Sequence, residues 1–159
     1  MRKLKLYLDT SVISYLYAPD TPEKMIETVA LWEEIKTGKY DIIISDLVFE
    51  ELDLCFEPKR TFMNDELDKI EAKILAKTTE ISELAKSYIK NGVLSQKSFS
   101  DCRHIAYAVT ENCDFLVSWN FKHLVNVNTI KGVKIVNAIN DYKEISIISP
   151  TMLISKEEE

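Results

Sequence analysis

Residues 4–11 read LKLYLDTS, a short apolar run that ends in an acid and two hydroxyl side chains. A run of this length and composition predicts a β-strand over residues 4–8. Thr10 or Ser11 can then cap a short helix that follows the strand. Functional sites of open α/β sheets lie at the carboxyl ends of the strands, which is where Asp9 stands. Asp9 is therefore the first candidate for a site residue.

The same alternation of short apolar runs and helical segments continues along the chain. The further strands that the sequence predicts are residues 41–45, 114–118, 133–136 and 144–148. The predicted helices are residues 23–36, 46–58, 61–76, 80–91 and 98–112. Ser98 and Asp101 have the spacing of a capping box at the start of the last helix. Strands that alternate with helices imply right-handed crossovers, so the sequence predicts the α/β class with a mainly parallel sheet of four to five strands.

The length and composition fit one globular domain. The chain has 159 residues, of which 46% are apolar and 29% are charged, with only three Gly and four Pro. This composition supplies a core and argues against collagen, a disordered linker or a turn-rich β-sandwich. We expect one domain over residues 1–150, followed by a disordered tail over residues 151–159.

Charge and cysteine content exclude several classes of protein. The 20 basic and 26 acidic side chains give a net charge of −6, which excludes a basic architectural nucleic-acid binder. A nucleic-acid enzyme is not excluded, because metal ions can invert the sign of a carboxylate site. No apolar run reaches the ~18 residues of a membrane span, so we expect a soluble, cytoplasmic protein with no membrane partner. Three Cys without a C-x-x-C pair indicate free thiols rather than a zinc site or a disulfide framework.

Acids and an amide stand where such a sheet would place its functional side chains. Asp9 ends the first strand, Glu50 and Glu51 lie in the helix after the second, Asp101 begins a later helix, and Asn120 follows a later strand. If the strands are neighbours, these side chains converge, and two or three carboxylates on a rigid scaffold can hold Mg²⁺ for phosphoryl transfer. Spacing alone leaves another interpretation open, because acids at helix starts also cap backbone amides and suit the helix dipole.

Four short motifs resemble those of the PIN-domain nucleases, and they occur in the family's order. They are LDTSVI (residues 8–13), SDLVFEEL (45–52), SDCRHIAYAV (100–109) and NCDFLVSWN (112–120). The resemblance spans about residues 4–148, and many single-domain members of the family are VapC-type toxins of toxin–antitoxin pairs. It implies a PIN-like three-layer sandwich, in which helices flank the sheet, and RNA cleavage that depends on Mg²⁺ or Mn²⁺.

The resemblance also implies roles for individual residues. Asp9, Glu51 and Asp101 match the catalytic carboxylates that bind the metal, with Glu50 as the alternative if the register shifts by one. Asn120 matches a further catalytic position at which many members have a fourth Asp, which leaves the number of metal ions open. The supporting residues that the resemblance implies are Ser118, Thr10 and Ser11.

Three further side chains are candidate contacts to the substrate. His104 lies on the same helical side as Asp101 and could touch RNA or transfer a proton, or it could pack against a strand. Trp119 could stack on a base, as aromatic side chains do in single-strand binders, or belong to the core or a dimer interface. Lys122 could contact phosphate or belong to the solvated surface.

These observations and the resemblance predict a divalent-metal-dependent endoribonuclease that acts as the toxin of a type II toxin–antitoxin pair. The expected partners are RNA, an antitoxin protein and a second copy of the chain in a homodimer. An alternative is a catalytically weak PIN-like module that binds RNA or protein, since Asn120 replaces an acid. A phosphatase with Asp9 as its nucleophile is disfavoured, because such enzymes have a second Asp two residues later, where this chain has Ser11.

Overall fold

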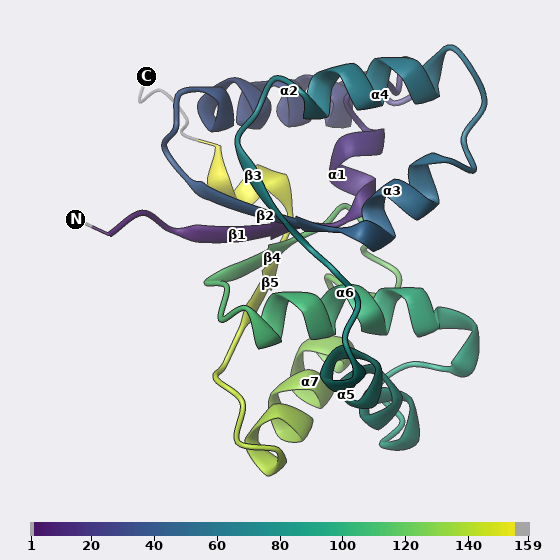
Figure 1. Ribbon diagram of the computed structural model, residues 1–159, viewed down its shortest axis with the longest axis vertical. Coiled ribbons are helices and arrows are strands. Elements are labelled where there is room, and N and C mark those ends of the chain that lie inside the picture. Colours follow the sequence, from purple (N-terminus) through teal and green to yellow (C-terminus); the bar gives the residue numbers. More distant parts are fainter. Residues whose placement is uncertain (1, 155–159) are drawn as a thin grey trace.

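A five-stranded parallel sheet forms the middle layer of the computed structural model, which describes residues 2–154 (Figure 1). The strands are β1 (Lys5–Leu8), β2 (Asp41–Ser45), β3 (Ala72–Leu75), β4 (Phe115–Val117) and β5 (Ser146–Ile148). They lie in the order β3-β2-β1-β4-β5, and every neighbouring pair is parallel. The predicted α/β class and parallel sheet are confirmed. The chain builds β2 and β3 on one side of β1 and then crosses to build β4 and β5 on the other.

Helices cover both faces of the sheet, which confirms the three-layer sandwich (Figure 1). One face carries α1 (Thr10–Ser14), α2 (Pro22–Lys36) and α4 (Lys59–Leu67), and the other carries α5 (Thr79–Lys90), α6 (Phe99–Thr110) and α7 (Val127–Ile139). Within β1, Tyr7 enters the core beneath α5, α6 and α7, whereas Leu6 and Leu8 enter the core on the opposite face. Strands of parallel sheets are buried on both faces in this way.

The turn from β1 into α1 is tight, and it determines the position of Asp9. Asp9 has extended backbone geometry and is the N-cap residue of α1, which begins at Thr10. The side chain of Asp9 accepts a hydrogen bond from the backbone N–H of Val12 at 3.4 Å. The prediction that Thr10 or Ser11 caps this helix is wrong, because helical geometry already starts at Thr10.

The predicted helix over residues 61–76 is wrong in its second half. α4 ends at Leu67, and the following segment forms β3 at the edge of the sheet, with Ile74 opposite Ile44 of β2. β3 is partly exposed, so it lacks the continuous apolar pattern of the inner strands. Pairing with β2 therefore overrides a local apolar spacing that also suits a helix.

The predicted strand over residues 133–136 is also wrong, because these residues lie inside α7. Val133 and Val136 are three positions apart and both are buried, which is a helical spacing. The Oδ1 atom of Asn126 accepts a hydrogen bond from the Thr129 backbone N–H at 2.9 Å and caps the helix. A short run of Val and Ile does not by itself distinguish a strand from a buried helical segment.

Two helix ends also differ from the predictions. α3 (Asp46–Leu52) ends well before residue 58, the predicted limit. A 3-10 helix, η1 (Gln96–Ser98), precedes α6, and the side chain of Ser98 makes no capping hydrogen bond, so the predicted capping box is not formed. The start of α6 is thus defined by the preceding turn rather than by a side-chain cap.

The predicted tail begins too early. A second 3-10 helix, η2 (Pro150–Leu153), follows β5 and packs against α2. The hydroxyl of Thr151 donates to the carboxylate of Glu27 on α2. Residues 151–153 therefore belong to the domain, and residues 155–159 of the predicted tail lie outside the described residues.

The three cysteines are free thiols, and Cys102 and Cys113 are buried. Burial raises the pKa of both of these thiols to about 12, so neither ionises at neutral pH. Between residues 2 and 154, no helix has the length and the apolar surface needed to cross a membrane.

Candidate functional site

A pocket of about 240 Å³ lies at the carboxyl ends of β1 and β4, where the strand order changes direction. Ligands of open α/β sheets bind at this point of the fold. Asp9 reaches the pocket from the end of β1, Glu51 from α3, Asp101 from the first turn of α6, and Asn120 from the loop after β4. The structure thus brings these four residues together from separate segments. The other lining residues are Thr10, Ser11, Ser14 and His104.

Asp9 is almost completely buried, with 3% of its surface exposed. One carboxylate oxygen accepts hydrogen bonds from the Ser11 hydroxyl and the Val12 N–H, and the other accepts from the Ser118 hydroxyl. Burial raises the pKa of Asp9, while a charge on His104 and these three hydrogen bonds oppose the rise. Ser11 and Ser118 therefore hold the carboxylate from two sides.

Glu51 is held by two neighbours. Its Oε1 atom lies 2.6 Å from His104 Nε2 and accepts a hydrogen bond from the Thr10 hydroxyl at 2.9 Å. Burial favours a higher pKa for Glu51, but the hydrogen bonds from His104 and Thr10 and the charges of His104 and Arg103 lower it overall. Only 2% of His104 is exposed, so its ring orients Glu51 from inside the protein.

A chain of hydrogen bonds continues from His104 into the core. His104 Nδ1 lies 2.7 Å from the hydroxyl of Tyr7, which lies 2.7 Å from the hydroxyl of Ser45. The Glu51 carboxylate can only accept, so His104 Nε2 carries a proton. If the ring is neutral, Tyr7 donates to Nδ1 and Ser45 donates to Tyr7; if the ring is protonated, both bonds reverse. The linking atoms are paired in either state, and burial raises the pKa of Tyr7 so that the phenol keeps its proton.

Tyr7 and Ser45 are not among the predicted site residues, although the sequence holds a signal for both. Tyr7 is the one residue of β1 with a hydroxyl group, and strand alternation places it opposite the face of Leu6 and Leu8. Ser45 ends the apolar run of β2 and is fully buried. A buried hydroxyl requires a hydrogen-bond partner, and a polar residue on the covering helix is the place to seek it.

Asp101 accepts fewer hydrogen bonds from the described side chains than Asp9 and Glu51 do. Among the described side chains, its hydrogen-bond donor is Asn120, whose Nδ2 lies 3.5 Å from Asp101 Oδ1. Burial raises the pKa of Asp101; charges on His104 and His123 oppose this rise, and those of Asp9 and Glu51 add to it. The Oδ1 atom of Asn120 accepts from the His123 backbone N–H at 2.9 Å. The amide of Asn120 therefore presents its nitrogen to Asp101.

The donors of the pocket suit a hard divalent cation. Mg²⁺ prefers oxygen ligands and keeps several waters beside one or two carboxylates. No three His, Cys, Asp or Glu side chains between residues 2 and 154 are close enough together to surround an ion as they stand. Glu51 contacts His104, and Asp9 accepts hydrogen bonds from two serines, so protein groups hold both carboxylates. Burial raises the pKa values of Asp9 and Asp101, and a cation bound between them would relieve that cost.

Four predicted residues do not line this pocket: Ser118, which is fully buried and holds Asp9, and the three that follow. Glu50 is exposed and forms an ion pair with Arg103 at 3.6 Å, so position 51 rather than 50 faces the other acids. Trp119 is 5% exposed, and its Nε1 donates to the Thr28 hydroxyl at 2.8 Å, which fits a core side chain rather than a surface for base stacking. Lys122 is exposed and lines a neighbouring pocket of about 400 Å³.

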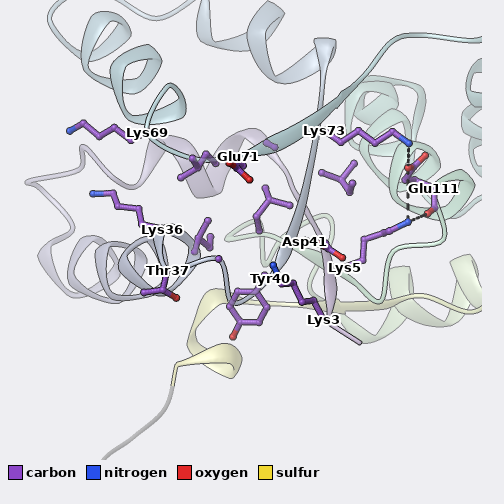
Figure 2. Close-up of a pocket in the computed structure, with 16 residues that line it drawn as sticks. Lys3, Lys5, Lys36, Thr37, Tyr40, Asp41, Lys69, Glu71, Lys73 and Glu111 are labelled. Atoms are coloured by element: carbon purple, nitrogen blue, oxygen red, sulfur yellow. Dashed lines mark hydrogen bonds and ion pairs between the residues drawn. The ribbon is translucent and has the colours of Figure 1, made fainter. Parts of the chain in front are cut away.

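A larger pocket, of about 760 Å³, lies at the opposite end of the sheet, where β1, β2 and β3 begin (Figure 2). Figure 2 shows Lys5 and Lys73 directed toward Glu111, with which both form ion pairs. Lys36 and Lys69 point outward in the same view, and both form ion pairs with Glu66 of α4. Because these lysines already have acidic partners, the pocket offers little net charge to a ligand. The smaller, acidic pocket is therefore the candidate functional site.

Comparison with known proteins agrees with this architecture. The family model described as PIN domain matches residues 6–122, a range that includes every acid of the pocket. No curated protein matches the chain in sequence. One similar solved structure is a chain of the crystal structure of VapBC2 from Rickettsia felis bound to a DNA fragment from their promoter, with a TM-score of 0.53 and 16% sequence identity. The alignment covers 92% of this chain and 98% of the other, so the two share a fold over nearly their whole lengths.

Proposed function

This chain belongs to the PIN-domain family, whose members are generally nucleases, and from that premise we propose that it is a divalent-metal-dependent endoribonuclease. One observation carries the proposal: Asp9, Glu51 and Asp101, from three separate segments, line one pocket at the carboxyl ends of β1 and β4. Clustered, partly buried carboxylates repel one another and need a cation, and phosphodiester cleavage uses such a cation.

Asp9, Glu51 and Asp101 would hold the ion, which in this proposal is Mg²⁺ or Mn²⁺. The chemistry that such an ion supplies is polarisation of the phosphodiester and activation of water. Neighbouring side chains of the protein orient these carboxylates. Ser11 and Ser118 hold Asp9, and the ring of His104 holds Glu51, so the carboxylates keep their directions before substrate binds.

The expected reaction is hydrolysis without a covalent intermediate. Water adds to phosphorus, the bond from phosphorus to O3′ breaks, and the departing oxygen takes up a proton, which leaves 5′-phosphate and 3′-hydroxyl ends. Asp9 is poorly placed to attack phosphorus itself, because it is 3% exposed and accepts three hydrogen bonds. This burial argues against a phosphatase with an aspartyl-phosphate intermediate.

We also propose that the chain is the toxin of a type II toxin–antitoxin pair, acting in the cytoplasm with an antitoxin protein as its partner. The support is the fold shared with a chain of the VapBC2 complex, which extends over 92% of this protein. Coexpression of the chain with and without the protein encoded next to it tests this proposal. Growth arrest that the neighbouring protein relieves is the expected result.

A catalytically weak binding module is a second candidate. Two observations favour it: Asn120 stands at a position where the family often has an acid, and the acids of the pocket do not form a complete ligand set as they stand. A folded wild-type protein that binds RNA but cuts none at any Mg²⁺ or Mn²⁺ concentration would favour this candidate over the nuclease.

The decisive experiment compares RNA cleavage by the wild type, Asp9→Asn and Glu50→Gln with added Mg²⁺ or Mn²⁺ and with EDTA. We expect metal-dependent cleavage by the wild type and a loss of at least about 100-fold in Asp9→Asn, because a metal ligand is removed. Glu50→Gln is the matched control, since Glu50 is exposed and lies outside the pocket. It should cut at the wild-type rate. Cleavage by Asp9→Asn at the wild-type rate would show that the site is misassigned.

A further inference from the structure

We propose that the pocket beside the acids binds single-stranded RNA, with an unpaired base stacked on Phe121 and phosphates held by Lys24 and Lys122. This pocket, which we name the aromatic cleft, has a volume of about 400 Å³, and its lining includes Tyr15, Lys24, Trp119, Phe121 and Lys122. The proposal rests on the endoribonuclease function, because the RNA in the cleft would be the substrate of the adjacent acids.

The aromatic cleft is continuous with the acidic pocket. Ser11 and Asn120 line both pockets. The hydroxyl of Ser11 holds Asp9, and the side-chain nitrogen of Asn120 faces Asp101. If one phosphate of a nucleic-acid strand lies at the acids, the neighbouring nucleotide therefore lies in the aromatic cleft.

Phe121 is the aromatic surface of the cleft that remains open. Its exposed fraction is 47%, compared with 5% for Trp119. The two rings pack edge to face, with centroids 6.0 Å apart, and a hydrogen bond from Trp119 to Thr28 fixes the inner ring. A ring supported from behind loses little freedom when a base stacks on it. Because every base has a π-face, such stacking tolerates many sequences.

The cleft also carries positive charge. The ammonium of Lys24 lies 5.3 Å from the ring centroid of Tyr15, 5.6 Å from that of Trp119 and 5.3 Å from that of Phe121, which is the geometry of cation–π contacts. Among residues 2–154, neither Lys24 nor Lys122 forms an ion pair with an acid. In a protein of net charge −6, these two ammonium groups beside the acids supply local attraction for phosphates.

The combination of an open aromatic ring and phosphate-binding cations fits a single strand better than a duplex. Bases of an A-form duplex are stacked on one another, so their faces cannot reach a ring on the protein surface. Bases of a single strand or loop can turn outward and stack on aromatic side chains. The aromatic cleft is therefore inferred to be the subsite for one unpaired nucleotide beside the acids.

RNA binding in an Asp101→Asn background, which should not cut, tests the proposal by fluorescence anisotropy. The probes are a short labelled oligouridylate and the same strand annealed to its complement. We expect Phe121→Ala to weaken binding of the single strand about 5- to 100-fold, because stacking on that ring is lost. Phe121→Trp should keep the affinity, and Phe56→Ala, which removes another exposed ring, should leave it unchanged.

Salt dependence tests the lysines separately. If Lys24 contacts phosphate, Lys24→Gln should reduce the slope of log affinity against log salt by about 0.7 for a single strand. Lys86→Gln, on the far helix α5, is the matched control and should leave the slope unchanged. Melting curves establish that each variant is folded. Phe121→Leu serves as a second variant that keeps apolar volume without a π-face, and it should also bind weakly.

Equal single-strand affinity for Phe121→Ala and its parent would overturn the proposal, as would an equal loss of affinity for the duplex. These failures are distinguishable from failure of the nuclease. If the wild type cuts no RNA but binding of single strands depends on Phe121, the proposed RNA-binding cleft is supported and the proposed nuclease function is wrong. If the wild type cuts RNA and Phe121→Ala changes neither cleavage nor binding, the proposed nuclease function is supported and the proposed RNA-binding cleft is wrong.

Discussion

At the scale of single residues, the three acids of the pocket differ in how firmly each is held. Asp9 accepts hydrogen bonds on both oxygens, and Glu51 accepts from Thr10 and contacts His104. Asp101 has only a 3.5 Å contact with Asn120 among the described side chains. Asp9 and Glu51 are therefore oriented in advance, and Asp101 is the acid that can turn to meet a bound ion.

The variant Tyr7→Phe tests whether the buried hydrogen-bond chain orients Glu51. Loss of the hydroxyl leaves His104 and Ser45 without their partner in the core, so we expect the free energy of unfolding to fall by about 1–3 kcal/mol. The affinity for Mn²⁺ should fall about tenfold, because a loosened His104 positions Glu51 less well. Denaturant unfolding and titration calorimetry with Mn²⁺ measure the two effects.

The matched control for this variant is Tyr107→Phe. Its hydroxyl is also in the protein interior but donates to Asp46, outside the pocket lining. Tyr107→Phe should lower stability without changing Mn²⁺ affinity. If the two variants bind Mn²⁺ equally well, the chain through Tyr7 does not position Glu51.

The variant Asn120→Asp should strengthen metal binding and weaken the metal-free protein. A carboxylate at this position can still accept from the His123 N–H, but it replaces a donor to Asp101 with a like charge. Bound Mg²⁺ compensates the repulsion, so calorimetry should show tighter Mg²⁺ binding and the metal-free protein should melt at a lower temperature. Unchanged Mg²⁺ affinity together with an unchanged melting temperature would place Asn120 outside the metal site.

At the scale of elements, the site depends on how β1 is fixed beside β4. Asp114, just before β4, accepts a hydrogen bond from the backbone N–H of Lys5 at 2.7 Å and two from Arg2 at 3.0 Å. The backbone N–H of Asp114 in turn donates to the carbonyl of Lys5 at 2.8 Å. These contacts set the register of the two strands whose carboxyl ends carry Asp9 and Ser118.

The variant Asp114→Asn should remove the part of the protein's pH-dependent stability that comes from this carboxylate. The hydrogen bond from Arg2, together with that from Lys5, lowers the pKa of Asp114 below its ordinary value of 3.8. A lowered pKa means that the carboxylate contributes stability above that value and loses the contribution as the pH falls through the folded-state pKa. Because Arg2 is exposed and solvent screens its pair with Asp114, we expect the variant to lose only about 0.5–1 kcal/mol at neutral pH and to match the wild type in strong acid.

Urea unfolding of both proteins across this pH range measures the effect. Asp20→Asn is the matched control, because Asp20 is exposed and forms no side-chain hydrogen bond or ion pair within residues 2–154. It should behave as the wild type at every pH. A constant difference between Asp114→Asn and the wild type at all pH values would contradict a role for the charge.

At the scale of the whole molecule, we expect two copies of the chain to form a two-fold dimer. α2 and η2 pack together, and they expose Ile26 and Met152, whose exposed fractions are 69% and 67%. Apolar surface of this kind is commonly covered in a symmetric dimer. Light scattering should give twice the chain mass for the wild type, and Ile26→Glu should give the monomer. A wild-type mass near 18.3 kDa would rule the dimer out.

The sequence by itself determined the α/β class, the inner strands and the segments whose acids meet in the pocket. The reason is that each of these signals is local. The first apolar run ends at Leu8 and α1 begins at Thr10, so Asp9 lies at this junction whichever strands pair with β1. Asp101 likewise lies in the first turn of α6, in a segment whose apolar spacing is helical. Because ligands of open α/β sheets bind at the carboxyl ends of the strands, these local signals predict which residues can share one site if their strands are neighbours.

Only the tertiary structure decided the features that depend on distant partners. Pairing with β2 made residues 72–75 a strand, and packing beside α5 kept residues 133–136 in a helix. Packing against α2 buried Trp119 and left Phe121 exposed, and the hydrogen bond between Tyr7 and His104 joins residues 97 positions apart. Local periodicity records which side of an element is apolar, but not which surface covers that side, because burial and pairing energies arise only between elements once they meet.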